Sequence, residues 1–144
     1  IAGGKLYCWG YGGYYATGLG VTTQFTTPQQ VGAGTTWTAV ATDLGTNGAN
    51  TCGIMGGALY CWGYNGYGTV GQGSTATTYY TTPTQVGTAT NWTAISSNSN
   101  GNGNGNDMCG IAGGVAYCWG NNAYGQGGNG TTTQQTLPAM VVAP

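Results

Sequence analysis

The chain has 144 residues, enough for one ordinary domain, and only Lys5, Asp43 and Asp107 carry an ionised side chain at neutral pH. One cation and no histidine argue against a nucleic-acid-binding surface and against ordinary acid–base catalysis, so we predict no catalytic residue, metal site or cofactor. Five tryptophans and eleven tyrosines favour ordered β structure, and no apolar run approaches the roughly 20 residues of a membrane helix.

Short β-strands are predicted in a recurring order along the chain. A strand over Lys5–Trp9 follows the glycines of "IAGG", and "WTAVAT" from Trp37 alternates large and small side chains. Next, "TCGIM" and "ALYCW" flank Gly56 and Gly57, a pair typical of a tight hairpin turn. "TPTQVG" from Thr82 predicts a short edge strand after its proline, and "WTAISS" and "GGVAYCWG" then continue the order. No stretch shows helical periodicity with caps.

Three anchors recur with a period of about 55 residues. The tryptophans of "YCWG" lie 53 and 57 residues apart, and the prolines of "TP" or "LP" lie 55 and 55 apart: Trp9, Trp62, Trp119; Pro28, Pro83, Pro138. Such a period is typical of a propeller or solenoid, and four short strands per unit match one propeller blade. We therefore predict an all-β fold of four-stranded propeller-type blades in tandem, an incomplete propeller or an open array.

One array is predicted over residues 1–144, with units at approximately 1–51, 52–108 and 109–144, of which the first and last are incomplete. This amounts to about 2.6 repeats. All five tryptophans are expected to pack in the repeat core, because a thin blade needs large side chains to bury enough area. The alternative for them is stacking on a ligand. They are Trp9, Trp37, Trp62, Trp92 and Trp119.

The stretch "CGIMGGALYCWGYNGYGTVGQG", followed by "TPTQVG" and "NWTAIS", resembles the repeat of the regulator of chromosome condensation family, and the resemblance covers nearly the whole chain. It implies a β-propeller, typically seven-bladed in that family. Asn50 and Asp107 stand where the family often has histidine, and the basic surface of its chromatin-binding members is missing. Exchange activity on a small GTPase and DNA binding are therefore not expected. The chain is more similar to secreted members that act as binding or inhibitory modules.

Two cysteine pairs are predicted to form disulfides across hairpins. Counting outward from the turn at Gly56 and Gly57 places Cys52 opposite Cys61, close enough for a bridge at a non-hydrogen-bonded pair. The same count from the next glycine pair places Cys109 opposite Cys118. Buried free thiols are the alternative. Paired cysteines without catalytic surroundings indicate an oxidising, extracellular compartment.

Cys8 has no predicted partner, because its register position would fall two residues before Ile1. The chain is expected to begin and end inside repeat units, so the strand at Lys5–Trp9 has an unpaired edge. We expect a neighbouring copy, or another part of the same chain, to pack on that edge and cover Leu6 and Trp9.

The surface is expected to carry glycans, because almost no charge keeps it soluble. Asn91 and Asn129 fit the N-glycosylation pattern. Burial in an assembly is the alternative explanation for the missing charge. The low-complexity stretch Ser97–Asp107 is expected to be a flexible loop. It faintly resembles a calcium loop, but one carboxylate is too few for a hard cation.

Two functions follow from these features. The first is a secreted, non-enzymatic structural subunit that self-assembles with copies of itself through incomplete blades, possibly into a fibre, since open strand edges recruit strands. The alternative is a fragment of a larger secreted propeller that acts as a protein- or carbohydrate-binding module on a face rich in Tyr, Asn and Gly. Neither involves nucleic acid or a membrane.

Overall fold

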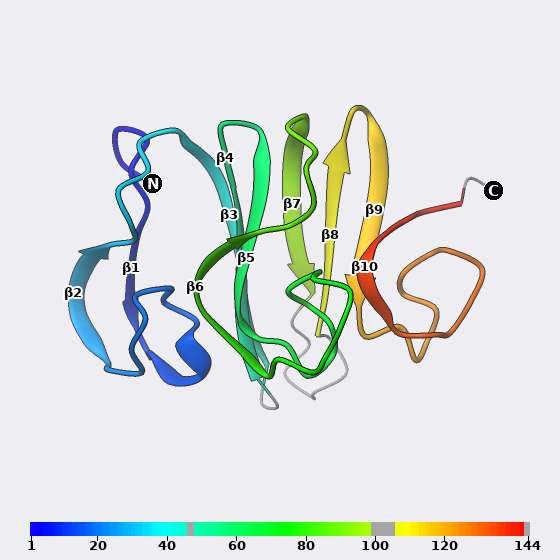
Figure 1. Ribbon diagram of the computed structural model, residues 1–144, viewed down its shortest axis with the longest axis horizontal. Helices are drawn as coiled ribbons and strands as arrows, with labels where there is room; N and C mark the ends of the chain where they lie inside the picture. Colours follow the sequence, from blue (N-terminus) through cyan, green and yellow to red (C-terminus); the bar gives the residue numbers. More distant parts are fainter. Residues whose placement is uncertain (46–47, 99–105, 143–144) are drawn as a thin grey trace.

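The computed structural model describes residues 1–45, 48–98 and 106–142, and these form three antiparallel sheets that stand side by side in chain order (Figure 1). The first sheet has two strands, and the second and third have four each. The strands are β1 (Tyr7–Gly10) and β2 (Phe25–Gln30); β3 (Trp37–Gly45), β4 (Gly48–Met55), β5 (Ala58–Tyr64) and β6 (Tyr79–Gln85); β7 (Trp92–Asn98), β8 (Asp107–Ala112), β9 (Val115–Gly120) and β10 (Gln135–Met140). A 3-10 turn, η1 (Gly13–Tyr15), lies between β1 and β2.

This arrangement confirms the all-β fold and the four-stranded blades in tandem. The sheets are offset from the sequence units, because the tryptophan strand near the end of one unit becomes the first strand of the next sheet. The second sheet therefore runs from Trp37 to Gln85 and the third from Trp92 to Met140, while the first contains only the equivalents of the last two strands. We call β1 and β2 the half-blade. Within the described residues, no helix has the length and apolar character needed to cross a membrane.

The glycine turns set the register of the hairpins as the sequence predicts. Gly56 and Gly57 both have positive φ, +57° and +79°, which glycine adopts without the steric cost that a Cβ imposes. Cys52 consequently lies opposite Cys61, and Cys109 lies opposite Cys118 across the next hairpin. The sulfur atoms of each pair are at disulfide distance, 2.09 Å.

The hydrophobic core lies between neighbouring sheets rather than within one of them. Leu6, directly before β1, and Val31, directly after β2, pack with Trp37 and Trp62 of the second sheet. A larger cluster joins the second sheet to the third in the same way, and its members include Leu59, Val70, Val86, Trp92, Met108 and Trp119. Each sheet thus depends on its neighbour for burial, as expected of a repeat array.

Four of the five tryptophans are buried, with 0–7% of their surface exposed. Trp9 is the exception, and its assignment to the repeat core is wrong for this chain, because 59% of its surface is exposed. The loop of the preceding sheet covers Trp62 and Trp119, and the described residues contain no loop in the equivalent position for Trp9. Leu6, which was expected to need a neighbour for cover, is buried against the second sheet at 1% exposure.

Candidate functional site

The half-blade presents an open strand edge. β1 pairs with β2 on one side, whereas its counterparts β5 and β9 each have a neighbour on both sides. Among the described residues, no strand pairs with the second edge of β1. An open edge offers N–H and C=O groups to any chain that can lie beside it. This is the edge that the sequence predicted at Lys5–Trp9.

A cavity of about 400 Å³ lies beside this edge, between β1 and the second sheet. Leu6, Cys8 and Trp9 line it from the half-blade, and Val40 and Thr42 line it from β3. The second and third sheets have two further strands in the place that corresponds to this space, β3 with β4 and β7 with β8. The cavity therefore lies beside the open edge of β1 and has a mainly apolar lining.

Cys8 faces this cavity with a half-buried free thiol. Burial raises the pKa of the Cys8 thiol, and the positive chain terminus opposes this shift weakly. The thiol is therefore protonated at neutral pH, which makes it a poor nucleophile. Its counterparts by register, Cys61 and Cys118, are both paired with a cysteine on the adjacent strand. The two cysteine pairs at disulfide distance suit an oxidising environment.

Two buried carboxyl groups lie at the contact between the second and third sheets. Asp43 and Asp107 are 0% and 4% exposed. Asp107 accepts a hydrogen bond from the Nδ2 of Asn98 at 3.2 Å. Burial raises the pKa of Asp107 to about 6; the hydrogen bond from Asn98 opposes the shift, and the negative charge of Asp43 adds to it. Within the described ranges, no three ligating side chains of His, Cys, Asp or Glu come together as a metal site.

We expect Asp107→Asn to stabilise the protein at pH 7 by about 1–2 kcal/mol, because it removes a buried charge. The native pKa of about 6 exceeds the usual unfolded value of about 3.9, so the stability contributed by protonated Asp107 is complete below about pH 4 and is lost as pH rises through 6. The variant should abolish this loss. Urea unfolding at pH 4, 5, 6 and 7 measures it, and an unchanged slope between pH 4 and 7 would contradict it. Asparagine fits this position, since Asn50 occupies it in the second sheet.

The two predicted glycosylation positions lie on loops, one directly before β7 and the other between β9 and β10. Asn91 is exposed, directly before β7. Asn129 is half-buried, and its Oδ1 accepts hydrogen bonds from the backbone N–H and the hydroxyl of Thr131. Most of the low-complexity loop, residues 99–105, lies outside the described residues, and so does the faint calcium pattern it carries.

We expect the protein from its native source to have an intact mass above the 14.5 kDa of the polypeptide, owing to N-glycans at Asn91 and Asn129. Enzymatic deglycosylation should reduce the excess, and Asn91→Gln and Asn129→Gln should each remove one part of it. Without reduction, the deglycosylated mass should correspond to two disulfides. The bare polypeptide mass before deglycosylation would leave burial in an assembly as the reason for the uncharged surface.

A cluster of five tyrosines joins the loop of the half-blade to the second sheet, and it was not predicted from the sequence. Its ring centroids lie 5.7–6.4 Å apart. The members are Tyr14, Tyr15, Tyr64, Tyr67 and Tyr79. Tyr14 and Tyr15 have φ of +59° and +60°, a left-handed backbone conformation that is unfavourable for residues other than glycine. The signal in the sequence was the concentration of tyrosine after the first two "CWG" motifs, but the contribution of Tyr79 depends on the fold.

Comparisons with known proteins support the family resemblance. Residues 56–100 match the family model described as "Regulator of chromosome condensation (RCC1) repeat". Among solved structures, Prp20p from Saccharomyces cerevisiae is similar with a TM-score of 0.77 and 16% identity over 96% of this chain and 34% of that one. The same yeast protein bound to Kap60 is similar with a TM-score of 0.77 and 16% identity over 96% and 33%. Human WBSCR16 is similar with a TM-score of 0.70 and 21% identity over 99% and 34%.

Residues 56–100 are therefore similar to a repeat of this family, and the described chain has the fold of part of such a propeller. It spans about a third of the length of each of these structures. Prp20p was characterised with its binding to Gsp1p and histones, and the second structure is a complex with Kap60, so these neighbours bind other proteins.

Proposed function

We propose that this chain is a secreted, non-enzymatic structural subunit that associates head to tail with copies of itself, building a continuous array or fibre. The observation that carries the proposal is the half-blade: β1 has an open edge beside an apolar cavity of about 400 Å³, while the third sheet at the other end of the array has all four strands. The two ends are visible as the blue and red extremes of Figure 1.

The two ends differ from each other, and this difference determines the kind of assembly. A contact between unlike surfaces is heterologous, and repeated heterologous contacts produce rings or open filaments rather than closed twofold dimers. Both ends also expose large apolar side chains: Ile1, Trp9 and Tyr11 at the first, and Leu137, Met140 and Val142 at the last. Apolar groups concentrated on opposite ends favour the burial of both in one contact.

The remaining features are compatible with an extracellular subunit. The two cysteine pairs at disulfide distance suit an oxidising compartment. The net charge of −1 provides little electrostatic repulsion between copies. A chain with one cation lacks the charge that phosphate neutralisation requires, so neither nucleic acid nor a membrane is a proposed partner.

Sedimentation velocity of the purified chain over a hundredfold concentration range tests the proposal, together with electron microscopy of the most concentrated sample. We expect the sedimentation coefficient to rise with concentration and the images to show rings or filaments. A single species with the mass of one chain at every concentration would refute self-assembly.

The alternative function is a section of a larger secreted propeller that binds a protein or a carbohydrate. This alternative is favoured by the coverage of the solved structures, because this chain spans only about a third of each. The tyrosine cluster is the candidate binding surface. Aromatic rings supply rigid contact area for such ligands. A glycan array with the Tyr79→Ala variant tests it, and Tyr124→Ala is the matched control, because Tyr124 is 74% exposed and has no ring contact in the cluster. Binding that both variants retain would exclude the cluster as the site.

A further inference from the structure

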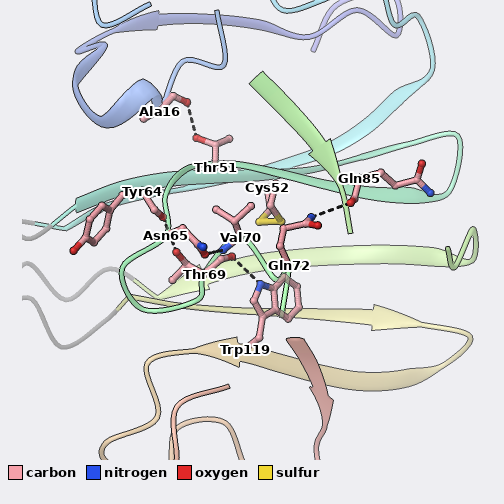
Figure 2. Close-up of a disulfide and its surroundings, with 11 residues drawn as sticks. Ala16, Thr51, Cys52, Tyr64, Asn65, Thr69, Val70, Gln72, Gln85 and Trp119 are labelled. Atoms are coloured by element: carbon pink, nitrogen blue, oxygen red, sulfur yellow. Dashed lines mark hydrogen bonds between the residues drawn. A yellow bond between two sulfur atoms is a disulfide. The ribbon is translucent and has the colours of Figure 1, made fainter. Parts of the chain in front are cut away.

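Consecutive sheets are joined by the same indole-to-carbonyl hydrogen bond in both places where they meet. The Nε1–H of Trp62 donates to the carbonyl oxygen of Ala16 at 2.9 Å, and the Nε1–H of Trp119 donates to the carbonyl oxygen of Thr69 at 2.8 Å. Figure 2 shows the indole of Trp119 beneath the loop that carries Thr69. In each case the acceptor is the seventh residue after the "YCWG" tryptophan of the preceding sheet.

A glycine two residues after each acceptor makes room for the indole. An added Cβ on Gly18 would lie 2.6 Å from the Nε1 of Trp62, and one on Gly71 would lie 3.3 Å from the Nε1 of Trp119. A side chain on Gly18 would therefore displace the ring of Trp62, and one on Gly71 would crowd the ring of Trp119 and the Cγ1 of Val86, which would lie 3.1 Å from the added Cβ. Both glycines also have positive φ, +71° and +72°. The loop thus forms a seat that consists of a carbonyl and a glycine, and it accepts the tryptophan of the next sheet.

A second hydrogen bond accompanies each seat, between the same loop and an outer strand of the next sheet. The N–H of Gly20 donates to the carbonyl of Thr81 at 3.0 Å, and the N–H of Gly73 donates to the carbonyl of Thr136 at 2.8 Å. These donors are the eleventh residues after their "YCWG" tryptophans, and the two acceptors lie 55 residues apart. The contact between sheets is therefore a repeated two-point attachment.

The third sheet carries the elements of a third seat. Counting seven, nine and eleven residues from Trp119 gives the carbonyl of Gln126, Gly128 with φ of +59°, and the N–H of Gly130. Gly128 is exposed, whereas Gly18 and Gly71 are buried beneath indoles. Val141 is only half-buried, whereas its counterparts Val31 and Val86 are buried against the tryptophans of the next sheet.

The half-blade carries the matching group. Trp9 is the first "YCWG" tryptophan, and 59% of its surface is exposed, although its two counterparts are buried at 0% and 1%. Thr26 on β2 lies 55 residues before Thr81 and so holds the position of the second acceptor. One end of the array therefore has an exposed seat, and the other has the exposed indole that such a seat accepts.

We infer that Trp9 of one copy docks on Gly128 of a second copy and donates its indole N–H to the carbonyl oxygen of Gln126, while the N–H of Gly130 donates to the carbonyl of Thr26. This inference rests on the proposed head-to-tail assembly and identifies its contact. The occupant is a second copy, because the contact continues an interface that this chain already forms twice with its own half-blade and sheets. Docking also covers Val141, as Val31 and Val86 are covered.

Variants at each end test the contact by sedimentation velocity. Trp9→Ala and Gly128→Ala should each weaken self-association at least about 30-fold, the effect expected of a central anchor residue. Trp9→Phe keeps an aromatic ring without the N–H and should weaken it less. Gly87→Ala controls for the backbone strain of Gly128→Ala, because Gly87 is exposed and has nearly the same φ, +60°. The two differ in one contact: an added Cβ on Gly87 has no atom within 4 Å, whereas one on Gly128 would lie 3.0 Å from the Cγ1 of Val141 in the same chain. The Gly87→Ala variant should associate like the unaltered protein.

Mixing the two variants provides the decisive measurement. A Trp9→Ala copy retains its seat and a Gly128→Ala copy retains its indole, so a mixture should form heterodimers that cannot extend. If the unaltered protein assembles and both variants assemble equally well, the seat is not the contact, although self-assembly stands. If the unaltered protein stays monomeric at every concentration, the proposed function itself fails and the docking fails with it.

Discussion

Replacing Trp62 by alanine is expected to lower the free energy of unfolding by about 4 kcal/mol, whereas replacing Trp9 by alanine in the same motif should lower it by less than about 1 kcal/mol. Trp62 is fully buried between the half-blade and the second sheet, and its removal leaves a cavity beside Trp37. The carbonyl of Ala16 would keep the hydrogen bond from Thr51, so most of the loss is packing. Trp9 is largely exposed in a single copy and has little packing to lose.

Thermal unfolding in dilute solution, where association is weakest, measures both variants. For a chain of this length, 4 kcal/mol corresponds to a fall in Tm of roughly 8–16 °C. Equal falls for the two variants would show that Trp9 is buried in the single copy as well. A large fall for Trp9→Ala that appears only at high protein concentration would instead agree with the docking inferred above.

Gly57→Ala is expected to destabilise the protein by about 3 kcal/mol, and Gly114→Ala by about 1 kcal/mol. The two glycines hold the same place in their hairpin turns and have nearly the same φ, +79° and +81°, so the cost of a left-handed alanine is shared. The two glycines differ in the atoms that an added Cβ would meet. A Cβ on Gly57 would lie 2.2 Å from the carbonyl oxygen of Thr90, while a Cβ on Gly114 would meet nothing within 4 Å.

The difference between these variants isolates the contact between sheets from the turn itself. Gly57 also accepts the backbone hydrogen bond of Trp92 at 3.0 Å, so a shift of the turn would move the start of β7. Chemical unfolding with urea measures both free energies. Equal effects would mean that the strain of the turn, rather than the close approach of Thr90, controls the stability at this position.

Local features of the sequence predicted the strands and their register. The Gly–Gly turns define two-residue hairpins, and a two-residue turn fixes which residues face each other, so Cys52 opposite Cys61 followed from counting alone. The 55-residue spacing likewise predicted tandem four-stranded sheets, because a repeated pattern of turns and strands builds a repeated structure. The disulfides, the glycans and the extracellular location stay predictions for the measurements given above.

The environment of each repeated residue could not be predicted from its motif. Trp9, Trp62 and Trp119 have the same neighbours in sequence, yet one is exposed and two are buried. Gly57 and Gly114 are likewise equivalent in sequence and differ in their surroundings. The sequence identifies Asp107 as an ionisable residue, but its raised pKa results from burial at a contact between two sheets.

The sequence by itself determined the strand content, the hairpin register and the period of this protein, because hydrogen bonding across a tight turn depends on residues close together in the chain. Only the tertiary structure decided which faces are covered, where the cavity beside β1 lies, and which of three equivalent tryptophans is left exposed. Burial between sheets depends on residues about 50 positions away, such as Ala16 with Trp62, and therefore on whether a neighbouring sheet stands next to each blade.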